Sequence, residues 1–256
     1  MVAQKGTVRV SVAMISYNGA EFLRGQVESV LEQLGQEDEL VVSDDGSTDG
    51  TTDILQEYQS LDGRVRLLSG PRQGIKKNVQ HVLQETRGRY IFLADQDDVW
   101  LPGKVERVLK AFETSKAAVV IHDAKVFAGA ENDPQILMES FFAFRRAKAG
   151  VLKNIIKNSY IGCCMAFRRE LLSTILPIPE GIEMHDQWIG ILGDYHAGKS
   201  CFLSEPLLLY RRHEDNNSAM SHYGMVRMIR NRMVFVFHFV RRALCKGACD
   251  SRLLSL

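Results

Sequence analysis

The amino-acid sequence predicts an α/β fold: a mixed, mainly parallel sheet with helices on both of its faces, plus a helical segment at the C-terminus. In the first half, short apolar runs alternate with segments of helical periodicity, and polar clusters follow several of the apolar runs. Repeated strand–helix units of this kind build a parallel sheet that helices cover on both sides. At 256 residues the chain is long enough for one large domain with a sizeable core.

The first half contains five predicted strands and four predicted helices. We expect the strands at Val8–Ile15, Glu39–Ser43, Arg64–Leu68, Tyr90–Ala94 and Ala117–Ile121, and the helices at 22–34, 51–60, 75–85 and 102–115. In open parallel sheets, ligands bind beyond the carboxyl ends of the strands, where the strand order reverses. Polar clusters follow the first, second and fourth strands, so the sequence predicts one ligand site at that edge.

The second half is less regular, and its predicted elements are shorter. We expect helices near 152–158, 168–176 and 187–192, an apolar strand at Tyr160–Phe167, and short strands at Ser200–Leu203 and Leu207–Tyr210. Residues 1–125 and 126–220 are expected to form two halves of one domain, and residues 221–256 a basic amphipathic helical tail.

Charge is balanced over the whole chain but concentrated in the tail. Lysine and arginine number 32 against 31 aspartates and glutamates, yet from Tyr223 onward seven basic residues accompany one acidic residue, Asp250. The seven are Arg227, Arg230, Arg232, Arg241, Arg242, Lys246 and Arg252. Such a surface suits an anionic membrane leaflet, although a basic helix can equally be a solvated face.

The sequence shows no secretion signal and no membrane-spanning segment. Gln4, Lys5 and Gly6 interrupt the N-terminus, and no apolar run approaches the ~18–20 residues that a membrane helix needs. The five cysteines have no metal-ligand spacing and are odd in number, which indicates a reducing compartment. We therefore expect a soluble cytoplasmic protein, at most peripheral to the inner face of the cytoplasmic membrane.

The most informative motif is Asp95-Gln96-Asp97-Asp98, which ends the apolar run Tyr90–Ala94. Three carboxylates in four positions repel one another, and a divalent cation that prefers oxygen ligands, such as Mg²⁺ or Mn²⁺, removes that cost. Mg²⁺ bound by one or two carboxylates usually takes further ligands from water and phosphate oxygens. The motif therefore predicts a metal that holds a phosphorylated ligand, and the alternative is a solvated acidic turn that binds nothing.

A second acidic cluster, residues 44–51, follows the second predicted strand. From Asp45 it resembles the first half of a calcium loop, but the twelfth position is Gln56 where such a loop needs a bidentate glutamate. Calcium is therefore not expected. Two interpretations stay open and are compatible: Ser47 or Asp49 caps the next helix, and one of the first two aspartates accepts the imide N–H of a uracil or thymine base.

Several segments together resemble family 2 glycosyltransferases of the GT-A fold, which is Rossmann-like. They are Val12–Asn18, Val41–Thr51, Gly74 with Asn78, Tyr90–Trp100, Gly162–Phe167, His185–Trp188 and Tyr210–Ser218, in the order expected for the family. The form Ala94–Trp100 is similar to the bacterial subgroup that builds O-antigen, capsule and related surface polysaccharides, often rhamnosyl- or galactosyltransferase-like. The resemblance covers about residues 8 to 220.

For the nucleotide sugar, the resemblance implies a set of contacts in residues 1–125. Ser16 and either Asp44 or Asp45 would line the base, Lys77 would lie near the nucleotide, and Asp95 would contact the ribose. Residues 126–220 would then form the acceptor and catalytic half of the same domain.

For the metal and the chemistry, the resemblance implies four further residues. Asp97 would bind the metal together with Asp98, and His213 would reach back to the metal or the diphosphate. Asp186 takes the position of the catalytic base, where the family usually has a Glu-Asp pair and this chain has His185-Asp186. The alternative for Asp186 is a helix N-cap.

The expected function is that of an inverting, metal-dependent glycosyltransferase with Mg²⁺ or Mn²⁺. It would move a sugar from a nucleotide-diphosphate donor, with UDP or dTDP expected, to a hydroxyl of a growing, lipid-linked bacterial surface glycan; no nucleic acid is expected as a partner. One alternative is a sugar-phosphate nucleotidyltransferase, which would usually have a glycine-rich loop after the first strand, unlike Ser16–Gly19. The other is a non-catalytic nucleotide-sugar-binding module, against which the presence of Asp186 argues.

Overall fold

The computed structural model describes residues 8–196, 200–213 and 224–253, with side chains described as far as Leu244 in the last helix. Its strands are β1 (Val10–Ser16), β2 (Glu39–Asp44), β3 (Val65–Ser69), β4 (Tyr90–Ala94), β5 (Val99–Trp100), β6 (Val119–Ala128), β7 (Gln135–Met138), β8 (Met165–Arg168) and β9 (Cys201–Arg211). Its α-helices are α1 (Leu23–Leu31), α2 (Thr51–Leu61), α3 (Ile75–Glu85), α4 (Lys104–Ser115), α5 (Phe141–Arg145), α6 (Val151–Ile156), α7 (Leu172–Ile175), α8 (His185–His196) and α9 (Met225–Leu253). Two 3₁₀ turns are η1 (Gly162–Cys164) and η2 (Arg169–Leu171).

The strands of the described residues form one mixed sheet. Its order is β3-β2-β1-β4-β8-β6-β9-β5, and β7 pairs with β6. β1 is parallel to both β2 and β4, β2 to β3, and β6 to β9, whereas β8 runs antiparallel between β4 and β6. The predicted mixed, mainly parallel sheet is therefore confirmed, and β1 is the strand at which the order reverses.

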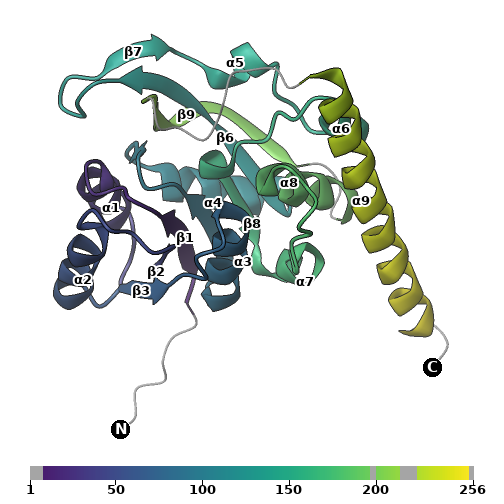
Figure 1. Ribbon diagram of the computed structural model, residues 1–256, viewed down its shortest axis with the longest axis horizontal. Coiled ribbons are helices and arrows are strands. Elements are labelled where there is room, and N and C mark those ends of the chain that lie inside the picture. Colours follow the sequence, from purple (N-terminus) through teal and green to yellow (C-terminus); the bar gives the residue numbers. More distant parts are fainter. Residues whose placement is uncertain (1–7, 197–199, 214–223, 254–256) are drawn as a thin grey trace, which may run out of the picture.

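Helices cover both faces of the parallel part. The crossovers from β1 to β2 and from β2 to β3 move across the sheet in the same direction, toward the β3 edge. The crossover from β3 to β4 moves in the opposite direction, to the other side of β1. Because such crossovers are right-handed, α1 and α2 lie on one face and α3 on the other. Val12, Leu40 and Ile91 are fully buried between these layers. In Figure 1, α1 and α2 lie at one end of the molecule and α9 at the other.

Local signals explain how α2 begins. Gly50 precedes it with φ of 96°, a region that favours glycine because it has no Cβ. The Asp49 carboxylate accepts hydrogen bonds from the backbone N–H and the hydroxyl of Thr51, at 3.1 and 2.6 Å. Asp49 thus takes the capping role that was predicted for it or for Ser47.

The predicted strand Tyr160–Phe167 is wrong in its first half. Residues 162–164 form η1, and only Met165–Arg168 pair in the sheet as β8. The turn lets the Cys163 carbonyl accept a hydrogen bond from the Lys104 ammonium group at 3.0 Å. A continuous apolar run lacks the alternation that would distinguish a strand from a buried turn.

One continuous strand, β9, replaces the two short strands that were predicted at its place. Its pairing with β6 skips from Leu203 opposite His122 to Pro206 opposite Asp123. Pro206 has no N–H to donate, so the ladder bulges there without ending. β6 continues to Ala128, beyond its predicted end, because β7 and β9 both pair with it.

The predicted C-terminal helix is confirmed as α9. Residues 221–223 and 254–256 of the predicted tail lie outside the described residues. None of the helices that the structure describes is both long enough and apolar enough to span a membrane.

Candidate active site

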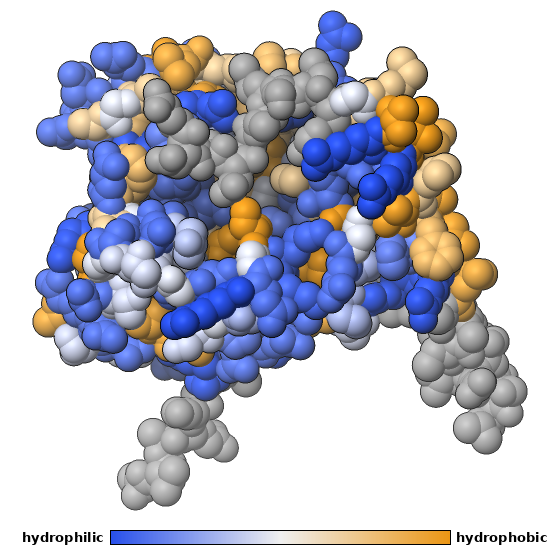
Figure 2. Space-filling view, in the orientation of Figure 1, coloured by the Kyte–Doolittle hydropathy of each residue, from blue (hydrophilic) through white to orange (hydrophobic). Residues whose placement is uncertain are grey.

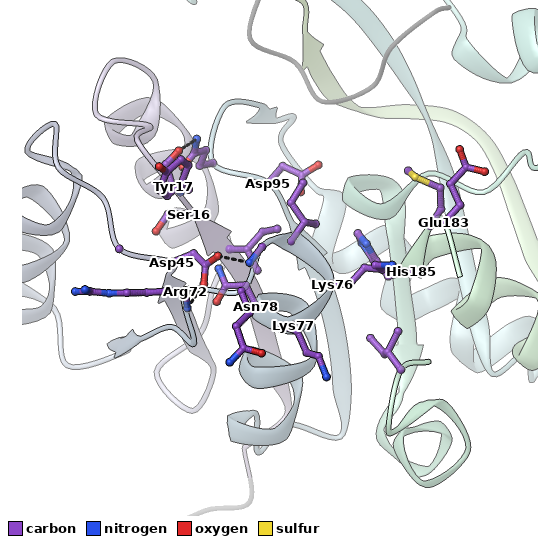
Figure 3. A pocket seen from close by; sticks show the side chains of 18 of the residues that line it. Ser16, Tyr17, Asp45, Arg72, Lys76, Lys77, Asn78, Asp95, Glu183 and His185 are labelled. Carbon is purple, nitrogen blue, oxygen red and sulfur yellow. Dashed lines mark hydrogen bonds between the residues drawn. The ribbon is translucent and has the colours of Figure 1, made fainter. Parts of the chain in front are cut away.

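A cavity of about 1160 Å³ opens beyond the carboxyl ends of β1, β2 and β4, where the strand order reverses. Figure 3 shows Ser16, Tyr17 and Asp45 on one side of it and Glu183 and His185 on the other. Asp95 lies between the two sides. The edge of the sheet that the sequence predicts for a ligand site is therefore the edge at which the cavity lies.

Asp44, the first aspartate after β2, is turned into the protein and does not line the cavity. It is 7% exposed, and its carboxylate accepts hydrogen bonds from the Ser16 hydroxyl at 2.8 Å and the Ser47 hydroxyl at 2.6 Å. The backbone N–H of Ser47 adds a third hydrogen bond at 2.8 Å. Asp44 therefore fixes the turn, whereas Ser16 lies on the cavity wall.

Asp45, the second aspartate, lines the cavity and holds a loop beside it. Its two carboxylate oxygens accept the backbone N–H groups of Arg72 and Gly74, each at 2.7 Å. Both of these residues have positive φ, 56° and 83°, so the loop turns sharply before α3. Asp45 thereby places Arg72 at the cavity wall, although its side chain extends away from Asp95 and His185 (Figure 3).

Two lysines at the start of α3 connect this wall to the opposite one. The Lys77 ammonium group forms an ion pair with Glu180 at 2.7 Å. The Lys76 ammonium group donates to the backbone carbonyls of Glu180 and Ile182, at 2.6 Å each. Lys77 therefore lies at the cavity, and its charge is paired with a carboxylate.

The loop after β4 contributes Asp95 and Gln96 to the cavity. Burial, together with the nearby carboxylates of Asp97 and Asp186, raises the pKa of Asp95 to about 7. The Gln96 amide exchanges two hydrogen bonds with the backbone of Tyr17, at 2.8 and 3.0 Å. Gln96 thus ties the loop after β4 to the turn after β1.

Asp97 and His213 meet at the edge of this loop. The Asp97 Oδ2 atom lies 2.8 Å from the His213 Nε2 atom, and the two side chains are 17% and 21% exposed. They meet because β5, just after Asp97, pairs with β9, just before His213. Carboxylate and imidazole are both ligands of divalent cations, and the pair lies beside a cavity wall, so its chemistry fits the predicted metal.

Asp98 lies in the core rather than at the cavity. It is fully buried, and its carboxylate accepts the backbone N–H of Arg211 at 3.1 Å. Burial, followed by the neighbouring charges of Asp97 and Asp95, raises the pKa of Asp98 well above its usual range. Asp97 lies in the bend after β4, whereas Asp98 directly precedes β5, whose pairing with β9 brings the Asp98 carboxylate to the backbone of Arg211.

An acidic group behind the cavity is a candidate metal site. Donor atoms of Asp95, Asp98 and Cys163 lie within 4.8 Å of one another. A hydrogen bond with Cys164, together with burial, raises the pKa of the Cys163 thiol well above its usual range. Since only a thiolate is a good ligand, the oxygens of this group suit Mg²⁺ or Mn²⁺ better than its sulfur does.

Asp186 lies in the first turn of α8, directly after His185 on the cavity wall. It is 5% exposed and does not itself line the cavity. Burial raises its pKa to about 6, against hydrogen bonds from the Gln187 backbone and the Asn158 side chain. Burial also lowers the pKa of His185 to about 4, with a contribution from Lys76, so this imidazole is neutral at pH 7.

Comparison with known proteins decides the family. The sequence model of "Glycosyl transferase family 2" matches residues 11–176, more than half of the chain. The chain belongs to glycosyltransferase family 2. The predicted resemblance is therefore confirmed.

Relatives of this family 2 chain agree with the predicted bacterial subgroup. It is 29% identical over 218 residues to an uncharacterized glycosyltransferase of Nostoc sp., covering 82% of this chain and 66% of the relative. It is 37% identical over 102 residues to TuaG of Bacillus subtilis, which is named for teichuronic acid biosynthesis, covering 40% of each chain. The matched part of the chain thus spans about two thirds of the length of the Nostoc relative and about two fifths of the length of TuaG.

A solved structure shares the fold of this family 2 chain. Residues 1–349 of TarS from S. aureus, in complex with UDP-GlcNAc, superpose with a TM-score of 0.67 at 20% identity. The match covers 89% of this chain and 66% of that one. At this level of identity the likeness concerns the fold, and it confirms the predicted GT-A architecture.

Sequence reasoning about this family 2 chain missed Arg211 as a positioning residue. Arg211 is 3% exposed, and its guanidinium donates to the backbone carbonyls of Asp97 and Gly129 and to the Glu131 carboxylate, at 2.6 to 2.8 Å. It therefore holds the acidic loop from beneath. The burial of Arg211 would have identified it. The sequence could not predict this burial, because the residues that follow, Arg212 and His213, are polar and typical of a surface segment.

The two tryptophans of this family 2 chain are core residues. Trp100 is 2% and Trp188 0% exposed, so neither offers a face to a sugar. Asp123, in the buried part of β6, is 2% exposed and accepts hydrogen bonds from Ser140 and from the backbone of Phe142. Its carboxylate therefore fixes the segment that begins α5.

Proposed function

We propose that this chain is an inverting, metal-dependent glycosyltransferase that transfers one sugar from a nucleotide diphosphate to a hydroxyl of a growing bacterial surface glycan. The observation that carries the proposal is that Asp95 and Asp97 line one cavity at the strand-order reversal, and that Asp186 is buried just behind the same cavity wall, next to His185. Burial, followed by the charges of Asp97 and Asp186, raises the pKa of Asp95. The name of the relative TuaG supports a cell-surface polymer as the product class.

The donor would lie across the cavity from β2 to α8. A volume of about 1160 Å³ is large enough for a nucleotide sugar, at the upper end of ligand sites. We place the base against Ser16 and Asp45 and the ribose against Asp95, with Asp44 acting through the turn that it fixes. Arg72, Lys76 and Lys77 are the basic residues of the cavity wall, and Lys77 is the one that we place at the diphosphate. The UDP-GlcNAc complex of TarS supports UDP or dTDP as the nucleotide.

Asp97 and His213 would hold Mg²⁺ or Mn²⁺, with Asp98 supporting the loop from the core. When bound, such a cation offsets the negative charge that develops on the leaving diphosphate. Arg211 keeps the backbone of Asp97 in place, and the pairing of β5 with β9 keeps His213 against it. The chain's own contribution is therefore a rigid acidic loop beside the donor phosphates.

Asp186 is the proposed base. Its carboxylate would take the proton of the acceptor hydroxyl while the acceptor oxygen bonds to the anomeric carbon. The bond from that carbon to the diphosphate breaks, and its electron pair leaves with the nucleotide. A pKa of about 6 keeps Asp186 largely ionised at pH 7 and matches a general base better than His185 with its pKa of about 4.

The proposed division of the chain follows from the same placement. Residues 1–125 would bind the donor, residues 126–220 would bind the acceptor and carry the base, and residues 221–256 would form the tail. Against a nucleotidyltransferase, the turn after β1 is Ser16–Gly19, which is not glycine-rich. Against a non-catalytic module, the chain retains an aspartate at the position of the base.

A donor-hydrolysis assay without acceptor, across UDP-, dTDP- and GDP-sugars with Mn²⁺ or Mg²⁺, tests this function. We expect slow release of one nucleoside diphosphate, its suppression by EDTA, and a large loss in Asp186→Asn. Release of pyrophosphate instead would identify a nucleotidyltransferase. Tight binding of a nucleotide sugar with no release of nucleoside diphosphate, whether or not an acceptor glycan is added, would identify a binding module.

A further inference from the structure

The C-terminal helix α9 carries a continuous stripe of exposed apolar side chains. Figure 2 shows hydrophobic side chains gathered along this helix, with hydrophilic ones beside them. The apolar stripe consists of Met225, Val226, Ile229, Met233, Val236, Phe237, Val240 and Leu244, whose exposed fractions lie between 39% and 83%. It extends over roughly 28 Å, at about 1.5 Å per residue. Contiguous exposed apolar surface of this kind marks an interaction site.

The opposite side of α9 already holds the helix on the domain. Phe235 is 2% exposed, and its ring lies edge-on to that of Trp188, with centroids 5.7 Å apart. Arg242 donates three hydrogen bonds to backbone carbonyls at the end of α7 and just beyond it. Each residue turns a helix by about 100°, so Met233 and Phe237, two positions before and after Phe235, point away from the domain.

The charges of α9 discriminate between the partners that could cover the apolar stripe. Asp250 is the one acidic residue in the sequence of Met225–Leu253. Arg230 and Arg241 are exposed along one edge of the stripe, and neither forms an ion pair with another described residue. A second copy packed on the stripe would bring arginines together without acidic partners. A surface of anionic lipid headgroups would neutralise them.

We propose that α9 docks through the apolar stripe onto a lipid surface that contains anionic headgroups. The inference rests on the proposed function, because a lipid-linked acceptor lies at such a surface. Docking would also place the cavity close to the lipid surface. The Asn231 amide of α9 donates to the Glu183 carboxylate at 2.7 Å, and Glu183 lines the cavity. The helix therefore joins the lipid-facing stripe to the wall that carries His185.

Co-sedimentation of the full chain with vesicles tests the proposal. The chain should pellet with vesicles of phosphatidylcholine and phosphatidylglycerol, much less with phosphatidylcholine alone, and less as salt is added. The double variant Met233→Gln, Phe237→Gln should bind at least about tenfold more weakly, because it removes apolar area from the interface. Arg230→Gln and Arg241→Gln should each weaken binding to the anionic vesicles about fivefold.

Matched controls keep this result specific to α9. Leu61→Gln removes an apolar residue that is 75% exposed on α2, and Lys110→Gln removes an exposed charge on α4; both should bind vesicles like the unmodified chain. None of these residues lines the cavity, so donor hydrolysis should be unchanged in all variants. If the unmodified chain binds vesicles but hydrolyses no donor, the proposed function is rejected and the lipid proposal is not. Equal binding to neutral and anionic vesicles, or a dimer that Phe237→Gln converts to a monomer, would overturn the lipid proposal.

Discussion

His213 Nε2 lies 2.8 Å from Asp97 Oδ2, although 116 positions separate the two residues in the sequence. The pairing of β5 with β9 creates the contact, since it brings the segment after β4 beside the segment after β9. A cation held at this pair needs both residues, and removal of either leaves one ligand beside the diphosphate.

Asp97→Ala and His213→Ala should each weaken Mn²⁺ binding by at least about tenfold. Loss of a residue that only orients a metal ligand already weakens binding about tenfold or more, and loss of the ligand itself should weaken it at least as much. Titration calorimetry with Mn²⁺ and the nucleoside diphosphate measures the affinity. Asp53→Ala, which removes an exposed aspartate on α2, should leave it unchanged. Undiminished Mn²⁺ affinity in both variants would move the metal to the group of Asp95 and Asp98.

The ion pair between Lys77 and Glu180 should compete with the donor. If Lys77 binds the diphosphate, its ammonium group must leave Glu180, which is 79% exposed. An exposed pair is worth about 0–1 kcal/mol, so Glu180→Gln should lower the donor KM up to about fivefold. Lys77→Met should raise it about tenfold, and Lys110→Gln should not change it. A Lys77→Met variant with unaltered donor KM would mean that Lys77 lies at the cavity wall without binding the diphosphate.

Arg211→Lys should destabilise the domain, because a lysine cannot replace the three separate hydrogen bonds of the buried guanidinium. We expect a loss of about 3 kcal/mol in the free energy of unfolding, measured with urea. The control is Arg107→Lys, since Arg107 is exposed and pairs with Glu205 at the surface. A loss no larger than that of the control would mean that Arg211 does not hold the acidic loop.

The raised pKa of Asp186 predicts two opposite pH dependences. Activity needs the carboxylate, so kcat/KM should fall about tenfold per unit as the pH drops below about 6. The contribution of Asp186 to stability runs the other way: its folded pKa lies above the unfolded one, so this contribution is fully present below about pH 4 and is lost as the pH rises through 6. Asp186→Asn should therefore raise the unfolding free energy at pH 8 by about 2 kcal/mol, and hardly at pH 4. An acidic limb near pH 4 would point to His185 instead.

The first half of the fold was predictable because each strand is a short apolar run between turn residues. β2 and β4 begin where they were predicted to begin, at Glu39 and Tyr90. Prediction failed where the neighbouring strand decides the outcome. β6 extends to Ala128 because β7 and β9 pair with it, and β9 passes through Pro206 because a bulge absorbs the missing N–H.

The site was predictable at the level of clusters but not of single carboxylates. Asp44 and Asp45 are adjacent, as are Asp97 and Asp98, and in each pair one residue is buried by the turn or the core. Which member faces the cavity depends on the backbone conformation of the turn that follows the strand, and composition carries no information about it. The contact of Asp97 with His213 depends on the whole sheet.

Asp186→Asn separates a base from a residue that only positions the first turn of α8. The amide keeps the size of the side chain and its acceptor oxygen, so donor and metal affinity should be retained, while kcat should fall roughly 10²–10⁴-fold. His185→Gln, one position away on the cavity wall, should reduce kcat far less. Near-normal turnover in Asp186→Asn would leave Asp186 as a buried first-turn residue that positions the start of α8.

The anomeric configuration of the product, determined by NMR on the glycan made by the unmodified chain, tests the single displacement most directly. One attack by the acceptor oxygen, assisted by Asp186, reverses the configuration at the anomeric carbon, so the new linkage should have the anomeric configuration opposite to that of the donor. A product that retains the donor configuration would contradict it.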